Sequence, residues 1–126
     1  MRLVDSSAWI EWLVDSPTGI ELAPTIPTAD QCVVPTIVQL EVAKWLTREV
    51  GEDKADSFIA FTRKCRVVDL DTATALRAAE LCRIHRLATA DAIVYATALI
   101  QAADVLTCDA HFEGLPGVVL VGKLVR

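Results

Sequence analysis

Four acidic residues stand where the sequence pattern favours another residue type or where ligands commonly bind: Asp5, Glu41, Asp91 and Asp109. Carboxylates gathered in one crevice repel one another, and a hard divalent cation such as Mg²⁺ or Mn²⁺ relieves that repulsion. A cation held by carboxylates keeps open positions at which it can bind a phosphodiester, activate an attacking water and stabilise the leaving oxygen. If the fold brings the four acids together, they predict metal-assisted phosphodiester hydrolysis.

Glu41 is the most informative of the four. It lies inside an apolar stripe at helical spacing, four residues from both Ile37 and Trp45. This position directs its carboxylate toward the interior or into a cleft. A structural glutamate paired with Lys44 on the next helical turn would account for the pattern equally well. From this residue alone, both interpretations stay open.

Asp5 closes a short apolar run, Leu3 and Val4, and precedes Ser6 and Ser7. In open α/β sheets the carboxyl ends of strands face the crevice where ligands bind, so Asp5 occupies a site position. An Asp-Ser-Ser run is also typical of a helix N-cap, and capping by itself would explain the aspartate. The two serines can cap the helix while Asp5 binds a ligand.

Asp91 and Asp109 also have simpler explanations. Asp91 lies in the first turn of a helix that Thr89 is placed to cap, where the helix dipole favours a carboxylate. That helix is so apolar that its N-terminus is expected to abut the sheet, and a carboxylate there needs a partner such as a cation. Asp109 follows the apolar run that ends at Cys108, and turn chemistry would account for it.

Short apolar runs alternate with amphipathic segments along the chain, which predicts strands alternating with helices. Strands are expected at residues 3–4, 32–34, 66–70, 104–107 and 118–121, and helices at 8–13, 36–51, 52–64, 71–86 and 89–103, the second capped by Thr36. The helix at 71–86 is expected to be amphipathic, with one apolar side formed by Ala75, Leu76, Ala79 and Cys82. The Pro-rich stretch LAPTIPTAD is expected to be a loop. This order predicts an α/β fold in three layers, α/β/α, with a short central parallel sheet of four to five strands. Residues 1–126 suit a single domain.

Composition restricts the function classes. The formal net charge is −5, so there is no global positive field to attract a polyanion. No segment approaches the ~20 apolar residues that cross a membrane, and we expect a cytoplasmic protein with no membrane partner. Cys32, Cys65, Cys82 and Cys108 are scattered without a Cys-x-x-Cys pair. We therefore expect reduced thiols, with neither a zinc site nor a disulfide framework.

Taken in order, four pieces of the sequence resemble the PIN-domain family, and within it the VapC-type toxins of bacterial and archaeal toxin–antitoxin pairs. The pieces are VDSSAWIEWL, Glu41 in the helix after the second strand, TADAIVYATAL around Asp91, and LTCDAHFEGLPGVVLV at the end. Each piece is weak alone, and their order and spacing over nearly the whole chain make the match specific.

The resemblance carries the family's four catalytic and metal-binding acids over to Asp5, Glu41, Asp91 and Asp109. It places Ser6 or Thr107 beside them as polar groups that orient a carboxylate or a bound water. The last motif varies within the family, and here DAHF offers His111 where a second acid often stands, with Glu113 as a fallback ligand to Asp109. We assign no catalytic role to His85 or His111, since neither has a Ser or Cys nucleophile arrangement.

The resemblance further implies an endoribonuclease dependent on Mg²⁺ or Mn²⁺, acting as the toxin of a VapBC-type module. Its partners would be an RNA substrate, a second copy in a homodimer, and a cognate VapB-type antitoxin whose C-terminal segment lies across the active-site groove. Trp9 and Trp12 are predicted as core residues, although an aromatic rim would also suit an antitoxin helix. Cations would then line the RNA groove, with these candidates: Lys44, Arg48, Arg63 and Arg86.

Two alternatives come from other function classes. A phosphoacceptor receiver domain has this length and strand–helix order, but it needs adjacent acids after the first strand and a lysine after the penultimate one. Here Asp5 is followed by two serines, and no lysine follows Thr107 directly. A non-catalytic interaction module that keeps the fold would be expected to have lost at least one of the four acids.

Overall fold

Five short strands form one parallel sheet in the computed structural model, which describes residues 1–124. The strands are β1 (Arg2–Val4), β2 (Cys32–Pro35), β3 (Arg66–Val68), β4 (Asp104–Thr107) and β5 (Val118–Leu120). Their spatial order is β3-β2-β1-β4-β5, so the first strand occupies the centre. There Leu3 pairs with Val33 on one side and Val105 on the other. Both faces of β1 are covered, which explains why Leu3 and Val4 are fully buried.

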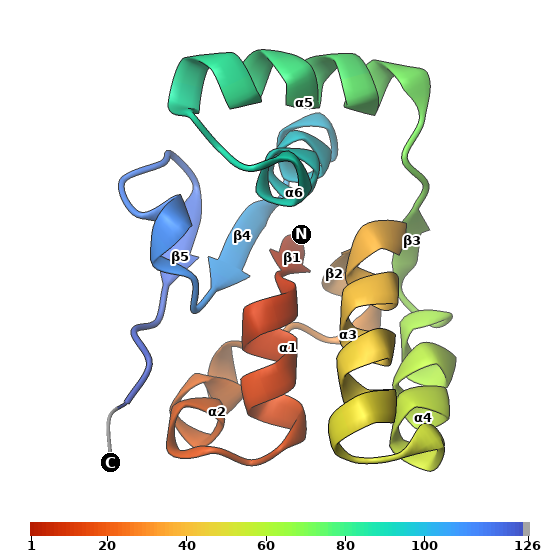
Figure 1. Ribbon diagram of the computed structural model, residues 1–126. Coiled ribbons are helices and arrows are strands. Elements are labelled where there is room, and N and C mark those ends of the chain that lie inside the picture. The colour runs from red at the N-terminus through yellow and green to blue at the C-terminus, as the bar shows by residue number, and fades with distance from the viewer. Residues whose placement is uncertain (125–126) are drawn as a thin grey trace.

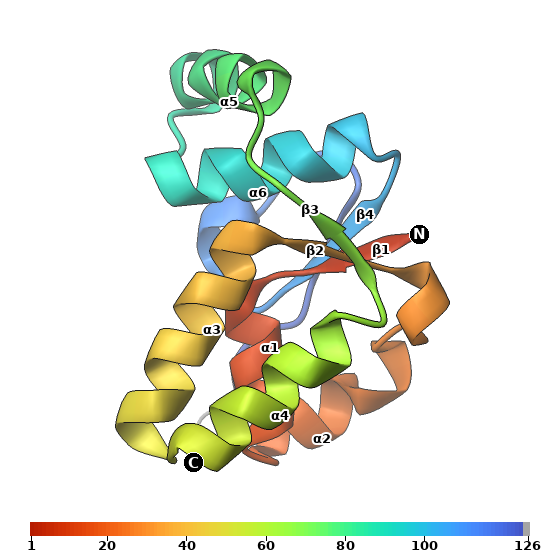
Figure 2. The ribbon, with the colours of Figure 1, turned by 90° about the vertical axis from the view of Figure 1, so that its right-hand side faces the viewer.

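Helices cover both faces of the sheet, which confirms the predicted α/β/α layers (Figures 1 and 2). One layer holds α1 (Ser6–Leu13), α2 (Pro17–Leu22), α3 (Thr36–Glu49) and α4 (Glu52–Thr62). On the other face α6 (Thr89–Ile100) packs against β2 and β4, and α5 (Thr72–His85) packs on α6 from outside. Because α6 lies between the sheet and α5, residues 92–98 are all buried. That position explains its apolar sequence.

The region after α1 differs from the prediction. Residues 17–22 form α2, which the sequence analysis missed because a six-residue helix carries too little periodicity to detect. Ser16 caps it by accepting a hydrogen bond from the Gly19 N–H, with proline at the first helical position. The stretch predicted as a loop contains two 3-10 turns, Ala23–Thr25 and Ala29–Gln31. The connection from α2 to β2 therefore consists of ordered turns.

Several predicted helix ends were wrong. Thr36 and Thr89 are the first helical residues, and the N-cap positions belong to Pro35 and Ala88, neither with a capping side chain. Helix α6, which was predicted to reach residue 103, ends at Ile100 because the chain reverses into β4. The reversal passes through Ala102, which has a positive φ of 53°.

The predicted apolar side of α5 was also wrong. The pattern favoured a buried side with Ala75, Leu76, Ala79 and Cys82, but the structure buries Thr74, Ala78 and Leu81 instead. Ala75, Leu76 and Ala79 are exposed. The reason is that α5 packs on α6 and not on the sheet, so the face it buries is set by another helix.

All four cysteines are free, as expected from their spacing. Over residues 1–124, none of the helices has the length and apolar character needed to span a bilayer.

Candidate active site

The positions of two of the acidic residues follow from the parallel arrangement of the strands. Asp5 comes directly after β1, and Asp109 comes two residues after β4. These strands are neighbours, and the Asp5 N–H extends their pairing by donating to the Leu106 carbonyl at 2.9 Å. Two aspartates that are 104 positions apart along the chain therefore lie at the same edge of the sheet. Parallel strands present their carboxyl ends together, and ligands bind at that edge in open α/β sheets.

Asp5 is almost completely buried, with 5% of its surface exposed. Its Oδ2 accepts hydrogen bonds from the Thr107 hydroxyl at 2.8 Å and the Ser7 hydroxyl at 2.9 Å. Burial raises the pKa of Asp5, the two hydroxyls oppose that rise, and the charge of Asp109 adds to it. Asp5 occupies the N-cap position of α1, but its side chain makes no capping bond. Capping therefore does not explain this aspartate.

Glu41 is half-buried in the second turn of α3, where its Oε1 accepts a hydrogen bond from the Ser6 hydroxyl at 2.8 Å. Within residues 1–124 it forms no ion pair with Lys44, so the alternative of a local helix pair is wrong. Ser6 is the neighbour of Asp5. This single hydrogen bond therefore joins the acid on α3 to the end of β1.

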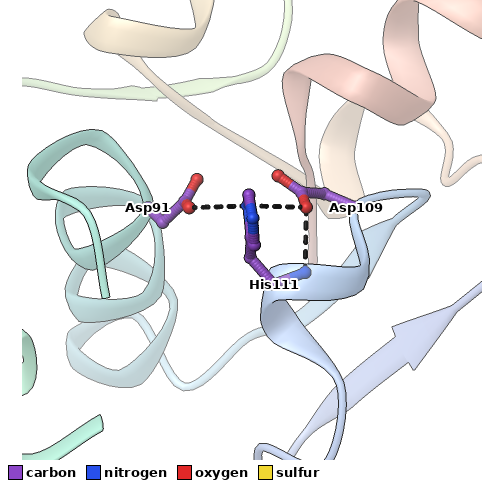
Figure 3. A group of neighbouring side chains, drawn as sticks. All are labelled: Asp91, Asp109 and His111. Atoms are coloured by element: carbon purple, nitrogen blue, oxygen red, sulfur yellow. Dashed lines mark hydrogen bonds and ion pairs between the residues drawn. The ribbon is translucent and has the colours of Figure 1, made fainter. Parts of the chain in front are cut away.

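Asp91, Asp109 and His111 form the exposed side of the group (Figure 3). The His111 Nδ1 lies 3.0 Å from the Asp109 Oδ1 and 3.7 Å from the Asp91 Oδ2. The same Asp109 oxygen accepts the His111 backbone N–H at 2.9 Å, which starts a 3-10 turn. One ligand atom from each of the three residues lies within 4.8 Å of the others. The imidazole thus stands between an aspartate from α6 and an aspartate from the loop after β4.

Electrostatics shows that the four acids share one environment. Burial is the largest cause of a raised pKa at Asp91, and the charges of Asp109, Asp5 and Glu41 raise it further. The charge of His111 acts in the opposite direction. At the other edge of the sheet, Asp104 is joined to Arg2 at 2.9 Å, and this partner lowers the Asp104 pKa. Asp104, which has a structural role, is therefore paired with a cation, whereas Asp91 lies among acids whose charges repel its own.

The structure brings some of the other residues predicted from the sequence to the acids and leaves others away from them. The two polar residues proposed as supports, Ser6 and Thr107, bond to Glu41 and Asp5. Glu113 is exposed and is not part of the group formed by Asp91, Asp109 and His111. The four proposed groove cations are all exposed, and none of them forms an ion pair with the clustered acids: Lys44, Arg48, Arg63 and Arg86. Arg48 is instead paired with Glu49.

The sequence analysis missed two residues that belong to this site. Ser7 bonds Asp5 and also accepts the Cys108 N–H at 3.0 Å, and His111 bridges two acids. The signal for Ser7 was its place beside Ser6 in the same motif. For His111, it was the position where the resemblance led us to expect an acid.

Comparison with known proteins places this geometry in a family. The model of the PIN domain matches residues 2–118. The chain belongs to the PIN domain family. This membership excludes the receiver-domain alternative, and the five-stranded α/β/α architecture agrees with it.

Solved structures of similar PIN-like shape come from toxin–antitoxin systems. A toxin–antitoxin complex from Klebsiella pneumoniae has a TM-score of 0.84 at 20% identity, covering 98% of this chain and 100% of the other. The VapC20 toxin of Mycobacterium tuberculosis, described as cleaving the sarcin–ricin loop, has a TM-score of 0.77 at 19% identity, covering 94% and 97%. DNA-bound VapBC from Salmonella typhimurium has a TM-score of 0.70 at 20% identity, covering 94% and 95%. A search of curated protein sequences found no match.

The donor atoms of this PIN domain fit a hard divalent cation. Carboxylate oxygens are the ligands that Mg²⁺ and Mn²⁺ favour, and the site offers them from α6, from the end of β1 and from the loop after β4. The raised pKa of Asp91, caused first by burial and then by the charges of the other acids, agrees with this, because a cation would favour its ionised form. Asp91 and Asp109 could hold such an ion, since their ligand atoms and that of His111 lie within 4.8 Å of one another. Asp5 and Glu41 are not part of that group, although their charges act on Asp91.

Proposed function

We propose that this PIN domain is an endoribonuclease that requires Mg²⁺ or Mn²⁺, with Asp5, Glu41, Asp91 and Asp109 as its metal-binding and catalytic residues. The observation that carries the proposal is the gathering of these acids at one edge of the sheet, where Asp5 and Asp109 follow the neighbouring strands β1 and β4 and His111 lies against both Asp91 and Asp109. The four acids come from four separate segments, yet the charges of the other three each raise the pKa of Asp91. A protein gains no stability from such an arrangement, which is typical of sites built for function.

The side chains have distinct tasks in this proposal. The Thr107 and Ser7 hydroxyls hold Asp5 in one orientation from the buried side, leaving Oδ1 without either of these bonds. Ser6 does the same for Glu41. Asp91 and Asp109 face each other across His111 at the exposed side, where a phosphodiester can approach. When bound, a divalent cation supplies a Lewis acid for the phosphate oxygens and favours deprotonation of water.

His111 lies between the two aspartates at the exposed side of the site. Its Nδ1 is near both carboxylates, and 76% of its side chain is exposed. We assign it a positioning role only.

The decisive experiment is RNA cleavage by purified protein with Mg²⁺ or Mn²⁺, repeated with EDTA and with Asp5→Ala and Asp91→Ala. We expect cleavage that chelation and either substitution abolish. Asp30→Asn is a matched control, because this exposed acid precedes β2 at the opposite edge of the sheet. Cleavage that survives EDTA or Asp91→Ala would refute the mechanism. A folded protein that never cleaves RNA would favour the non-catalytic interaction module.

We further propose that the chain is the toxin of a VapBC-type module with a VapB-type antitoxin. Support comes from the similar structures, several of which are described as toxin–antitoxin complexes. A second support is an apolar hollow of about 170 Å³ between α1 and α4, lined by Trp12, Leu13, Phe58 and Phe61 with Lys54 at its margin. Trp12 is half-buried there, whereas Trp9 is completely buried in the core. An apolar antitoxin segment with an acidic residue would suit this surface.

Growth of bacteria that express the chain tests the toxin role. We expect arrest that Asp5→Asn abolishes and that a short neighbouring reading frame relieves on co-expression. Nuclease activity in vitro without growth arrest would support the proposed enzyme activity and refute the toxin role.

A homodimer completes the proposal. The supporting feature is a second apolar hollow, of about 490 Å³, beside α5 and α6 and lined by Leu70, Ala75, Ala79, Cys82 and Ile93. Ala79→Glu would place a charge there, so we expect it to yield monomers in light scattering. Ala73→Glu on an exposed site of the same helix, outside the hollow, is the control and should remain dimeric. A dimer that tolerates Ala79→Glu would place the interface elsewhere.

A further inference from the structure

An acidic nuclease needs cations close to its site, because RNA binding depends on neutralising backbone phosphates. The net charge of this chain is −5, and within residues 1–124 His111 is the only basic residue that lies within ion-pair distance of the four acids. None of the four exposed cations considered from the sequence forms an ion pair with them. A different cation must therefore contact the substrate next to the acids.

A hollow of about 490 Å³ adjoins the acidic group on the side of β5. Its lining includes Ser7, Cys108, Asp109, Leu120, Gly122 and Lys123. Two of these residues belong to the site already described, since Ser7 bonds Asp5 and Asp109 contacts His111. The hollow is therefore continuous with the acids, and Lys123 is the only basic residue in its lining among residues 1–124.

Lys123 is held in place by the backbone on both sides. Before it, the Val121 N–H donates to the Thr107 carbonyl at 2.9 Å, extending the pairing of β5 with β4. After it, the Leu124 N–H donates at 2.8 Å to the hydroxyl of Thr18, which is buried in α2. Figure 1 shows this segment descending from β5 past the end of β4 toward α2. The lysine thus projects from a chain segment anchored at two points.

Lys123 shares the lining of this hollow with Cys108 and Asp109, and its side chain is exposed. Within residues 1–124, Lys123 forms no ion pair with any carboxylate. Its ammonium group is therefore available to an external anion.

We propose that Lys123 binds a backbone phosphate of the RNA adjacent to the cleaved one, in the hollow formed by β5, Ser7 and Asp109. This inference rests on the proposed ribonuclease function. It assigns the segment after β5 to substrate binding, where Lys123 sets the position of the strand relative to the acids.

The test measures RNA affinity as a function of salt in the presence of Mg²⁺. An Asp91→Asn background prevents cleavage, and the probe is a fluorescently labelled pool of short random-sequence RNA. Removing one phosphate contact should lower the slope of log affinity against log salt by about 0.7, which is the value for a single-stranded nucleic acid. We expect Lys123→Gln to show this decrease and about tenfold weaker binding at low salt, and Lys123→Arg to restore the slope.

Lys64→Gln is the matched control, because Lys64 is an exposed lysine that precedes β3. It should leave slope and affinity unchanged. In the cleavage-competent protein, Lys123→Gln should raise KM while kcat changes less than about threefold. Thr18→Val removes the hydroxyl that accepts the Leu124 N–H. It should weaken RNA binding without changing the slope of log affinity against log salt.

The outcomes separate the two proposals. RNA binding and cleavage with an unchanged slope in Lys123→Gln would overturn the role of Lys123 alone. A parent protein that neither binds nor cleaves RNA would overturn the ribonuclease proposal, and this inference with it. Thermal unfolding should be the same for Lys123→Gln and the parent, because an exposed side chain adds little stability. A large loss of stability would instead make Lys123 a structural residue.

Discussion

Thr107→Val tests the idea that the buried hydroxyls support the acids. Thr107 is completely buried, and its hydroxyl donates to Asp5 at 2.8 Å while accepting the Asp109 N–H at 3.0 Å. Valine has nearly the same shape but can make neither bond. A hydrogen bond to a charged group contributes about 1.5–3 kcal/mol, and an unsatisfied N–H costs about 1 kcal/mol or more. We therefore expect a loss of about 3 kcal/mol, which in a domain of this size lowers Tm by roughly 10 °C.

The measurement is urea unfolding in EDTA, followed by the fluorescence of the three tryptophans, of which Trp9 is completely buried. Thr107→Ser is the matched control, because it keeps the hydroxyl and removes only a methyl group, at a cost of about 1 kcal/mol. If Thr107→Val is as stable as the parent, the hydroxyl does not support Asp5 and the reasoning about these contacts fails.

The same pair of variants predicts a dependence on pH. The hydroxyl favours the ionised form of Asp5, so its removal raises the pKa of this already perturbed carboxyl further. A raised folded-state pKa means that the folded protein binds a proton before the unfolded chain does, so folding becomes relatively more favourable as pH falls through that pKa. The difference between Thr107→Val and the parent should therefore be largest at neutral pH and decrease in mildly acidic buffer. A constant difference would contradict the assignment to Asp5.

Three further predictions concern the site and its scaffold. Asp91→Asn removes a carboxyl group whose pKa is raised by burial and by the neighbouring acids, so it should raise Tm in EDTA. It should also abolish the stabilisation that Mn²⁺ gives the parent in thermal unfolding. Ser6→Ala frees Glu41, and titration calorimetry should show about 10–100-fold weaker Mn²⁺ binding. Gly19→Ala would make a β-carbon overlap the Glu11 carbonyl and should cost at least about 1–3 kcal/mol in urea unfolding, whereas Gly122→Ala, which meets open space, should be neutral.

Local physics accounts for what the sequence analysis predicted correctly. Apolar runs such as Cys32 to Val34 form strands because both faces of a parallel sheet are covered, and the segments between them have helical periodicity. The acids after β1 and β4 were identifiable because the carboxyl ends of parallel strands share one edge. The apolar sequence of α6 indicated burial, which the structure confirms. Each of these features depends on neighbours within a few residues.

Contacts between distant segments were decided only by the tertiary structure. The strand order puts β1 beside β4, and this places the Thr107 hydroxyl on Asp5 from 102 positions away. No local pattern could predict that Ser6 would bond Glu41, that His111 would stand between two acids, or that Lys123 would line the neighbouring hollow. The face that α5 buries was mispredicted for the same reason, because α6 determines it. Periodicity specifies which element forms, whereas the packing of elements against one another determines which side chains meet.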